Sequence, residues 1–329
     1  MNVPAPEKTR PLLFLAPMAG VTNTVFRRLC KKLGADVLTT EFVSAEGILH
    51  RNERTRRYLE FEPEERPVGV QLFGAEPERL AMAVQAVREW VSPDFIDLNF
   101  GCPVNKVVAK NGGSALLKDC PLLRSVANAV VRAAGDLPVT AKIRIGWDSR
   151  SVNAVETARI LEGEGISRIA VHGRTKEQGY TGLADWRVIA EVVSAVRVPV
   201  IGNGDIDSAE SALRRVRESG VAGLMIGRRA MAHPWIFTEL RAAFGDGDAP
   251  AEVSLEEKWN FILEHVRREI EWWDGREELA VKSMRSRLMA YTRGFPGGAR
   301  LREKMQHATS LETLVQIAAE YLAQSEVAV

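Results

Sequence analysis

Short apolar runs alternate with longer amphipathic stretches from residue 12 to about residue 244. Strand-like composition marks eight of these runs, at residues 12–16, 36–40, 68–72, 95–99, 139–143, 168–171, 198–202 and 223–226. Helical periodicity lies between most of them, at residues 24–33, 78–90, 122–134, 152–164, 186–196 and 208–218. Because parallel strands need a long crossover and helices provide it, the alternation predicts a parallel sheet.

Eight strand–helix units predict an α/β fold of the (β/α)8 TIM-barrel type, for which about 250 residues are typical. A doubly wound open sheet is the alternative, and it usually carries a glycine-rich fingerprint after its first strand. The segment after the first run, Pro17-Met18-Ala19-Gly20, lacks that fingerprint. We therefore predict a barrel domain at residues 1–244.

The chain changes character after residues 245–250 (Gly-Asp-Gly-Asp-Ala-Pro), which indicate a linker. Ser254 and Glu257 have the spacing of a capping box, which predicts a helix running to about residue 272. Helical patterns follow at residues 278–291, 299–306 and 310–323. Four helices with short connections predict a small four-helix bundle at residues 251–329.

Polar residues and glycines gather directly after the predicted strands, where a TIM barrel builds its active site. A solvated surface would instead scatter polar groups among the helices. The residues in question are Pro17, Met18, Glu41, Gln71, Asn99, Cys102, Lys142, Arg144, His172, Arg174, Asn203, Gly204, Asp205, Gly227 and Arg228. We expect them to surround one barrel mouth.

Two pairs of basic residues, Lys142 with Arg144 and His172 with Arg174, are two positions apart and so point the same way along their strands. Such a concentration of positive charge is costly unless an anion lies close by. The alternative is salt bridging to acidic residues of the same mouth, namely Asp97, Glu41 or Asp205.

An anionic cofactor would satisfy this charge. The loops after the seventh and eighth strands contain Asn203 and three glycines, in the place where TIM barrels commonly hold phosphate on backbone N–H groups. A lysine deeper in the barrel suits the N1–C2=O edge of a reduced flavin, whose anionic form a nearby cation stabilises. His172 has a second interpretation as a core histidine bonded to a backbone carbonyl.

Cys102, between Gly101 and Pro103, is one of three cysteines, with Cys30 and Cys120. This small, odd number favours a reducing cytoplasmic setting over a disulfide framework, and the spacing predicts no metal site. Cys102 has two possible roles, a nucleophile with His172 as its base or a protonated general acid. The residues alone do not separate them. No apolar run approaches the roughly 20 residues of a membrane span, so we expect no membrane association.

Several segments resemble, in order, the motifs of the tRNA-dihydrouridine synthase family, with the bacterial B subgroup most similar. The active-site segment is Leu-Asn-Phe-Gly-Cys-Pro at 98–103, followed by Lys106 and by Asn-Gly-Gly-Ser-Ala-Leu-Leu at 111–117. Further matches are at residues 16–22, 171–175, 203–206 and 225–228. The resemblance extends from about residue 12 to residue 320 and includes the helical tail.

This resemblance implies reduction of the C5–C6 double bond of a uridine in tRNA, with FMN as cofactor and NADPH or NADH as reductant. It implies hydride transfer from flavin N5 to uracil C6, with Cys102 protonating C5 from the opposite face. The implied FMN contacts are Pro17, Met18, Ala19, Gln71, Lys142, His172, Asn203, Gly204, Asp205, Gly227 and Arg228. The implied contacts to the base or its ribose-phosphate are Asn99, Arg144 and Arg174.

The tail carries a local basic segment in a chain whose net charge is only +1. Residues 282–304 contain seven Lys or Arg against one acid, Glu303, with Tyr291 and Phe295 between them. A phosphate backbone needs such a footprint. With the family resemblance, we predict tRNA contacts at Lys282, Arg285, Arg287 and Tyr291.

Three other functions remain open at this point: the same chemistry on ribosomal RNA, flavin-dependent reduction of a free pyrimidine, and RNA binding without catalysis on a barrel scaffold. Nothing in the sequence indicates an obligate protein partner. The modified uridine and the preference between the two nicotinamide cofactors are not predicted.

Overall fold

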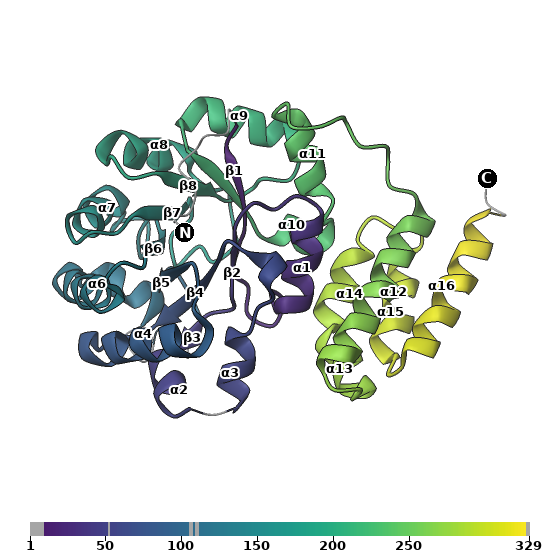
Figure 1. Ribbon diagram of the computed structural model, residues 1–329. Coiled ribbons are helices and arrows are strands. Elements are labelled where there is room, and N and C mark those ends of the chain that lie inside the picture. The colour runs from purple at the N-terminus through teal and green to yellow at the C-terminus, as the bar shows by residue number, and fades with distance from the viewer. Residues whose placement is uncertain (1–9, 52, 105–107, 109–111, 327–329) are drawn as a thin grey trace.

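The computed structural model describes residues 10–51, 53–104, 108 and 112–326. Its sheet has parallel strands in the order β1-β9-β8-β7-β6-β5-β4-β2, with β3 paired to β4 (Figure 1). The strands are β1 (Leu12–Leu15), β2 (Leu38–Thr39), β3 (Val43–Ser44), β4 (Val68–Phe73), β5 (Phe95–Phe100), β6 (Val139–Arg144), β7 (Arg168–His172), β8 (Val200–Asn203) and β9 (Gly223–Ile226). A bridge between Phe14 and Val37 joins the two ends of the sheet, so the predicted TIM barrel is confirmed.

The second predicted strand differs most from the structure. Residues 36–40 yield only the two-residue β2, and the unpredicted β3 follows it. Asp36 N donates to the Leu13 carbonyl at 2.8 Å, while the Asp36 carboxylate accepts from Leu13 N at 2.9 Å and pairs with Arg10 at 2.7 Å. A side chain thus takes part of the pairing that a longer strand would have made with β1.

Helices cover the outside of the barrel (Figure 1). They are α1 (Thr24–Lys32), α4 (Pro77–Val91), α6 (Cys120–Ala134), α7 (Ala154–Gly163), α8 (Trp186–Ala195) and α9 (Ala209–Ser219), close to the predicted ranges. The segment between β3 and β4 forms α2 (Ala45–Leu49), α3 (Glu53–Leu59) and η1 (Pro63–Glu65). Two shorter helices follow strand ends, η2 (Gly113–Lys118) and α10 (Arg228–Ala232), and α11 (Ile236–Ala243) packs beside α9 on the outside of the barrel.

Two apolar clusters pack on opposite faces of the strands. The larger one packs the sheet against the helices, and includes Leu13 and Leu15. The smaller one contains the alternate residues Leu12 and Phe14, and fills the barrel interior. The Arg168 guanidinium lies 5.0 Å from the centre of the Phe14 ring. This packing fills the barrel interior below the carboxyl ends of the strands.

Strand register aligns the predicted site residues at that end. Asn99 pairs with Lys142 across β5 and β6, and Arg144 pairs with His172 across β6 and β7. His172 in turn pairs with Asn203 across β7 and β8. Residues paired across neighbouring strands lie side by side, so the register gathers these side chains around one mouth.

The tail is helical as predicted, but its described part has five helices. They are α12 (Leu255–Trp272), α13 (Glu277–Ser283), α14 (Arg285–Tyr291), α15 (Gly298–His307) and α16 (Leu311–Glu326). Ser254 and Glu257 form the predicted capping box before α12. The helix expected at residues 278–291 is divided at Met284, which is fully buried. No Gly or Pro marks this division in the sequence, so periodicity alone could not reveal it.

The tail lies against one side of the barrel. Figure 1 shows α12 and α14 beside α1 and α10, and these helices are in contact. Within the described part of the chain, no helix is both long enough and apolar enough to span a membrane.

Candidate active site

A cavity of about 1090 Å³ lies at the carboxyl ends of the strands. Most of the predicted site residues line it, namely Pro17, Met18, Ala19, Gln71, Asn99, Cys102, Lys142, Arg144, His172, Asn203, Gly204, Asp205, Gly227, Arg228 and Tyr291. Four do not: Arg174, Lys282, Arg285 and Arg287. Lys106 and Asn111 of the family motif lie outside the described residues.

A chain of buried hydrogen bonds fixes the part of the cavity next to Cys102. Thr140 Oγ1 donates to Asp97 Oδ1 at 2.5 Å, and Gln71 Nε2 donates to Asp97 Oδ2 at 2.6 Å. Asn99 Nδ2 donates to Gln71 Oε1 at 2.8 Å, and Asn99 Oδ1 accepts from Cys102 N at 2.8 Å. The turn that carries the thiol is therefore held by hydrogen bonds that link β5 to both of its neighbours, β6 and β4.

Cys102 has the properties of a protonated thiol. It is 7% exposed, and burial raises the pKa of its thiol. A backbone hydrogen bond from Val104 and the charges of Arg144 and Lys142 act in the opposite direction, but burial is the largest cause. A nucleophilic cysteine needs a lowered pKa, whereas a proton donor must keep its proton at neutral pH. The environment thus favours the general-acid role over the nucleophilic one.

Lys142 and His172 face the cavity without a partner. Burial, followed by the charge of Arg144, lowers the pKa of Lys142 to about 8. Burial and four surrounding cations hold the pKa of His172 far below its usual range, so its ring is neutral at neutral pH. Among the described residues, neither side chain makes a hydrogen bond or ion pair. A ligand with acceptor atoms would supply those bonds.

Arg144 and Arg174 instead hold the segment that follows β7. Arg144 donates to the carbonyls of Gly101, Thr175 and Gly179 at 2.9, 2.7 and 2.9 Å. Arg174 donates to the Gly182 carbonyl at 2.6 Å and to both carboxylate oxygens of Asp205 at 2.8 Å.

The structure therefore corrects the expected contact of Arg174 with the substrate. Its side chain is 2% exposed and does not line the cavity. Its Nε donates to the Thr181 carbonyl at 3.2 Å, and its Nη2 donates to the Gly182 carbonyl and to Asp205. Arg144 keeps a place in the cavity wall, although three of its bonds go to the backbone.

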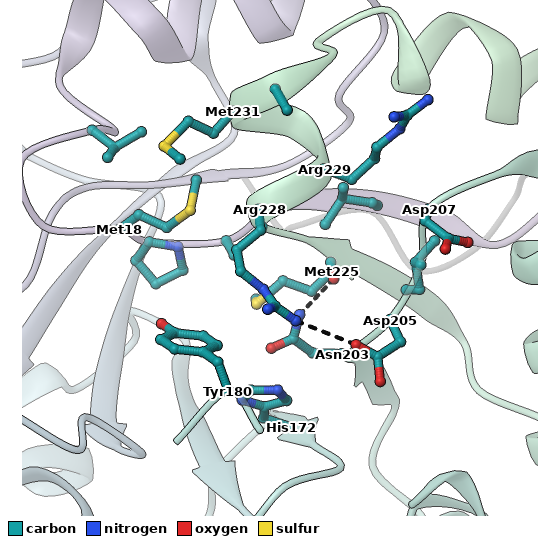
Figure 2. A pocket seen from close by; sticks show the side chains of 18 of the residues that line it. Met18, His172, Tyr180, Asn203, Asp205, Asp207, Met225, Arg228, Arg229 and Met231 are labelled. Carbon is teal, nitrogen blue, oxygen red and sulfur yellow. Dashed lines mark hydrogen bonds and ion pairs between the residues drawn. The ribbon is translucent and has the colours of Figure 1, made fainter. Parts of the chain in front are cut away.

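Arg228 and Tyr180 lie in the same wall of the cavity as His172 (Figure 2). The Arg228 guanidinium lies 4.8 Å from the centre of the Tyr180 ring and donates to Asp205 Oδ1 at 3.3 Å. Asn203 Nδ2 donates to the Met225 carbonyl at 2.7 Å, which adds a side-chain bond between the ends of β8 and β9. The Asp205 carboxylate is engaged by protein groups, so its loop offers backbone N–H groups, not a free carboxylate, to a ligand.

Tyr180 and Leu183 were not predicted. They are 58% and 78% exposed, and both line the cavity. They lie in a segment without periodicity, between a strand and its helix. Their position in the sequence could have identified them, since large apolar residues in a glycine-containing loop after a barrel strand are candidates for ligand contact.

The helical tail forms the outer part of the cavity. Leu255, Lys258, Ile262, Arg293 and Phe295 line it together with Tyr291. Tyr291 is 5% exposed and its hydroxyl is 2.9 Å from His265 Nδ1. It therefore belongs to the cavity wall, not to an exposed basic surface. Lys258 was missed because it precedes the basic segment of the tail.

The structure also corrects the expected RNA contact of Arg287. Its side chain is 2% exposed and forms an ion pair with Glu269, which is fully buried. Lys282 lies on the surface and pairs with Glu278, while Arg285 is half-buried. Arg287, one of the arginines of the basic segment, is therefore buried in an ion pair. A count of charges in the sequence cannot distinguish it from an exposed arginine.

No cluster suited to a metal occurs among the described residues, where three or more His, Cys, Asp or Glu side chains nowhere come together.

The fold and cavity define a TIM-barrel protein with a polar site at the carboxyl ends of its strands. A family model described as "Dihydrouridine synthase (Dus)" matches residues 14–326. The chain belongs to this family, as its motifs predicted.

Two relatives match nearly the whole chain. The tRNA-dihydrouridine synthase B of Pseudomonas aeruginosa is 42% identical over 290 residues, covering 88% of this chain and 86% of the relative. A probable tRNA-dihydrouridine synthase of Aquifex aeolicus is 37% identical over 306 residues, with 92% and 94% covered. An old yellow enzyme homologue from Zymomonas mobilis superposes with a TM-score of 0.51 at 12% identity, covering 74% of this chain and 91% of its own, and shares the barrel fold.

Proposed function

We propose that this protein reduces a uridine of tRNA to 5,6-dihydrouridine, with FMN as cofactor and NADPH or NADH as reductant. Family membership supports the overall reaction. The observation that carries the chemistry is the placement of Cys102, whose thiol has a raised pKa, in one cavity with Lys142 and His172, whose side chains make no hydrogen bond or ion pair within the described part of the chain.

The residues present fit a flavin mononucleotide. A cavity of about 1090 Å³ exceeds the roughly 300–1,000 Å³ of ordinary ligand pockets, so it has room for a cofactor and a base. The backbone of residues 203–205 and 227–228, with the Arg228 side chain, would hold the phosphate. Lys142 and the neutral His172 would face the ring system, which Pro17, Met18, Ala19 and Gln71 would border. When bound, FMN would supply the hydride that reduces uracil C6.

Cys102 would complete the reduction by donating its proton from Sγ to C5. Its raised pKa keeps that proton in place until it is needed. Asn99 holds the thiol-bearing turn by accepting from the backbone N–H groups of Gly101 and Cys102, at 3.1 and 2.8 Å. The Cys102 carbonyl is fixed as well, because Ser114 Oγ donates to it at 2.9 Å.

The tail would bind the RNA from which the uridine is taken. A base in a folded tRNA must leave its stack to reach the cavity, at a cost of a few kcal/mol that contacts to the RNA backbone offset. Lys258 and Arg293 line the cavity, and Arg300 is exposed further along the tail, as are Lys282 and Lys304, which pair with Glu278 and Glu320. Residues 251–329 would act as the docking unit and residues 1–244 as the catalytic unit.

Oxidation of NADPH by the FMN-loaded protein, with unmodified tRNA or free uridine as acceptor, tests the proposal. We expect turnover with tRNA and little with free uridine, because a free nucleoside makes no contact with the tail. Equal turnover would favour reduction of a free pyrimidine, and failure to take up FMN would favour RNA binding without catalysis. Sequencing tRNA and ribosomal RNA from a deletion strain separates the two RNA substrates.

A further inference from the structure

The loop that follows β1 joins the cavity to the helical tail. Pro17, Met18 and Ala19 form part of the cavity wall. Asn23, at the other end of this loop, is the N-cap of α1, with its Oδ1 accepting from Phe26 N at 3.1 Å. The loop is thus a short bridge between the expected flavin and the first helix.

Two buried charged residues of the tail hold the far end of this loop. Asn23 Nδ2 donates to Glu269 Oε1 at 2.7 Å. Arg287 Nη1 pairs with the same carboxylate and also donates to Asn23 Oδ1 and to the Val21 carbonyl, at 3.3 and 3.4 Å. Glu269 is 0% and Arg287 2% exposed, so neither is placed to bind RNA.

The barrel holds the loop from the other side. Glu41 Oε2 accepts from Gly20 N at 2.7 Å, and Arg27 Nη1 donates to the Thr22 carbonyl at 2.8 Å. Inside the loop, Met18 N donates to Thr22 Oγ1 at 2.9 Å. Barrel and tail therefore share the anchoring of one short segment, and either one alone would leave part of it unbonded.

Helix packing brings the tail to the other border of the same region. Helix α14, which carries Arg287, is in contact with α10. Helix α10 begins at Arg228, directly after β9, and β9 is the neighbour of β1 in the barrel. In Figure 1, α14 lies beside α10 and α1. The tail therefore contacts both α1, which follows β1, and α10, which follows the neighbouring strand β9.

We propose that Glu269 and Arg287 are positioning residues that hold the loop of residues 17–23 in its flavin-binding shape, so that the tail completes the cofactor site as well as docking RNA. This inference rests on the proposed function, since it needs FMN to bind here. A buried ion pair is a poor source of stability compared with apolar packing, which agrees with a role in fixing one geometry.

The test compares Glu269→Gln with Glu264→Gln in the full chain. Glu264 lies on the same helix and pairs with Arg268 at 2.7 Å, but its side chain is 43% exposed. We expect Glu269→Gln to weaken FMN binding about 10-fold or more and to change the visible circular dichroism of the bound flavin, as loss of a buried charged contact would. Glu264→Gln should bind FMN as the unchanged protein does.

Hydrogen exchange of the flavin-free protein gives a second readout. Peptides covering residues 17–23 should exchange faster in Glu269→Gln than in Glu264→Gln, while peptides covering β6 should not differ. Should Glu269→Gln fail to fold, Arg287→Lys, which keeps the positive charge, is compared with Arg287→Met and is expected to restore FMN affinity in part.

The outcomes separate the two proposals. The positioning role would be overturned if Glu269→Gln and the unchanged protein had equal FMN affinity and equal protection of the loop from exchange. It would also be overturned if Arg287→Lys, Arg287→Met and the unchanged protein bound FMN equally well. Either result would leave the proposed function standing. Failure of the unchanged protein to bind FMN would overturn both.

Discussion

Replacing Lys142 by methionine should stabilise the flavin-free protein while weakening flavin binding. Burial lowers the pKa of Lys142 to about 8 from 10.5. A difference of about 2.5 in pKa corresponds to about 3 kcal/mol of unfolding free energy at neutral pH. Because the side chain faces solvent in the cavity, we expect about 1–2 kcal/mol of this to be observed.

The stability difference between Lys142→Met and the unchanged protein should depend on pH, in a direction that follows from the lowered pKa of Lys142. Below pH 8 the lysine is charged in both the folded and the unfolded chain, so the folded state carries the full cost. Between pH 8 and about 10.5 the folded chain releases the proton first, so the unfolded chain binds more protons and stability rises with pH. The advantage of Lys142→Met should therefore be full at pH 7 and absent near pH 10.5.

Urea unfolding of flavin-free protein, followed by tryptophan fluorescence at pH 7, 9 and 10, measures this effect. Lys32→Met is the control, because Lys32 is an exposed lysine at the end of α1. A Lys142→Met protein that is less stable than the unchanged protein at pH 7, or whose gain does not change with pH, would refute the reasoning.

Two further predictions concern the tail. Changing Lys282, Arg293 and Arg300 together to glutamine should reduce the slope of tRNA affinity against salt by about 2–3, because each lost phosphate contact contributes about 0.7–0.9, and reduction of bound flavin should be unchanged. An unaltered slope in filter-binding assays would remove these residues from the RNA interface. Arg287→Met should lower the unfolding free energy by about 3–5 kcal/mol, because it leaves Glu269 charged and buried. Denaturation in urea checks this value, and a loss below about 1 kcal/mol would show that the pair is not held as described.

Sequence patterns were sufficient to predict the barrel, because short apolar runs alternate with longer stretches of helical periodicity along the chain. They also placed Asn99, Lys142 and His172 correctly, because residues at the ends of parallel strands must meet at one mouth. The raised pKa of Cys102 could not be predicted, since it comes from burial that only the folded chain creates.

The errors about the two arginines have one physical source, which is that sequence does not show where a long side chain points. Arg174 and Arg287 carry the same charge as Arg228, yet the first two are buried among protein acceptors and Arg228 is 48% exposed. Tyr180 lies in a loop, where no hydrophobic periodicity indicates which side chains are exposed. The division of the tail helix at Met284 is set by packing, with no helix-breaking residue to announce it.

Oxidation of the bound reduced flavin by unmodified tRNA, followed in a single turnover, tests the central claim that Cys102 is the proton donor. The account predicts that Cys102→Ala binds FMN and is reduced by NADPH as the unchanged protein is, but that its flavin is reoxidised by tRNA about 10²–10⁴-fold more slowly. Reoxidation of Cys102→Ala by tRNA at the rate of the unchanged protein, with dihydrouridine formed, would contradict it.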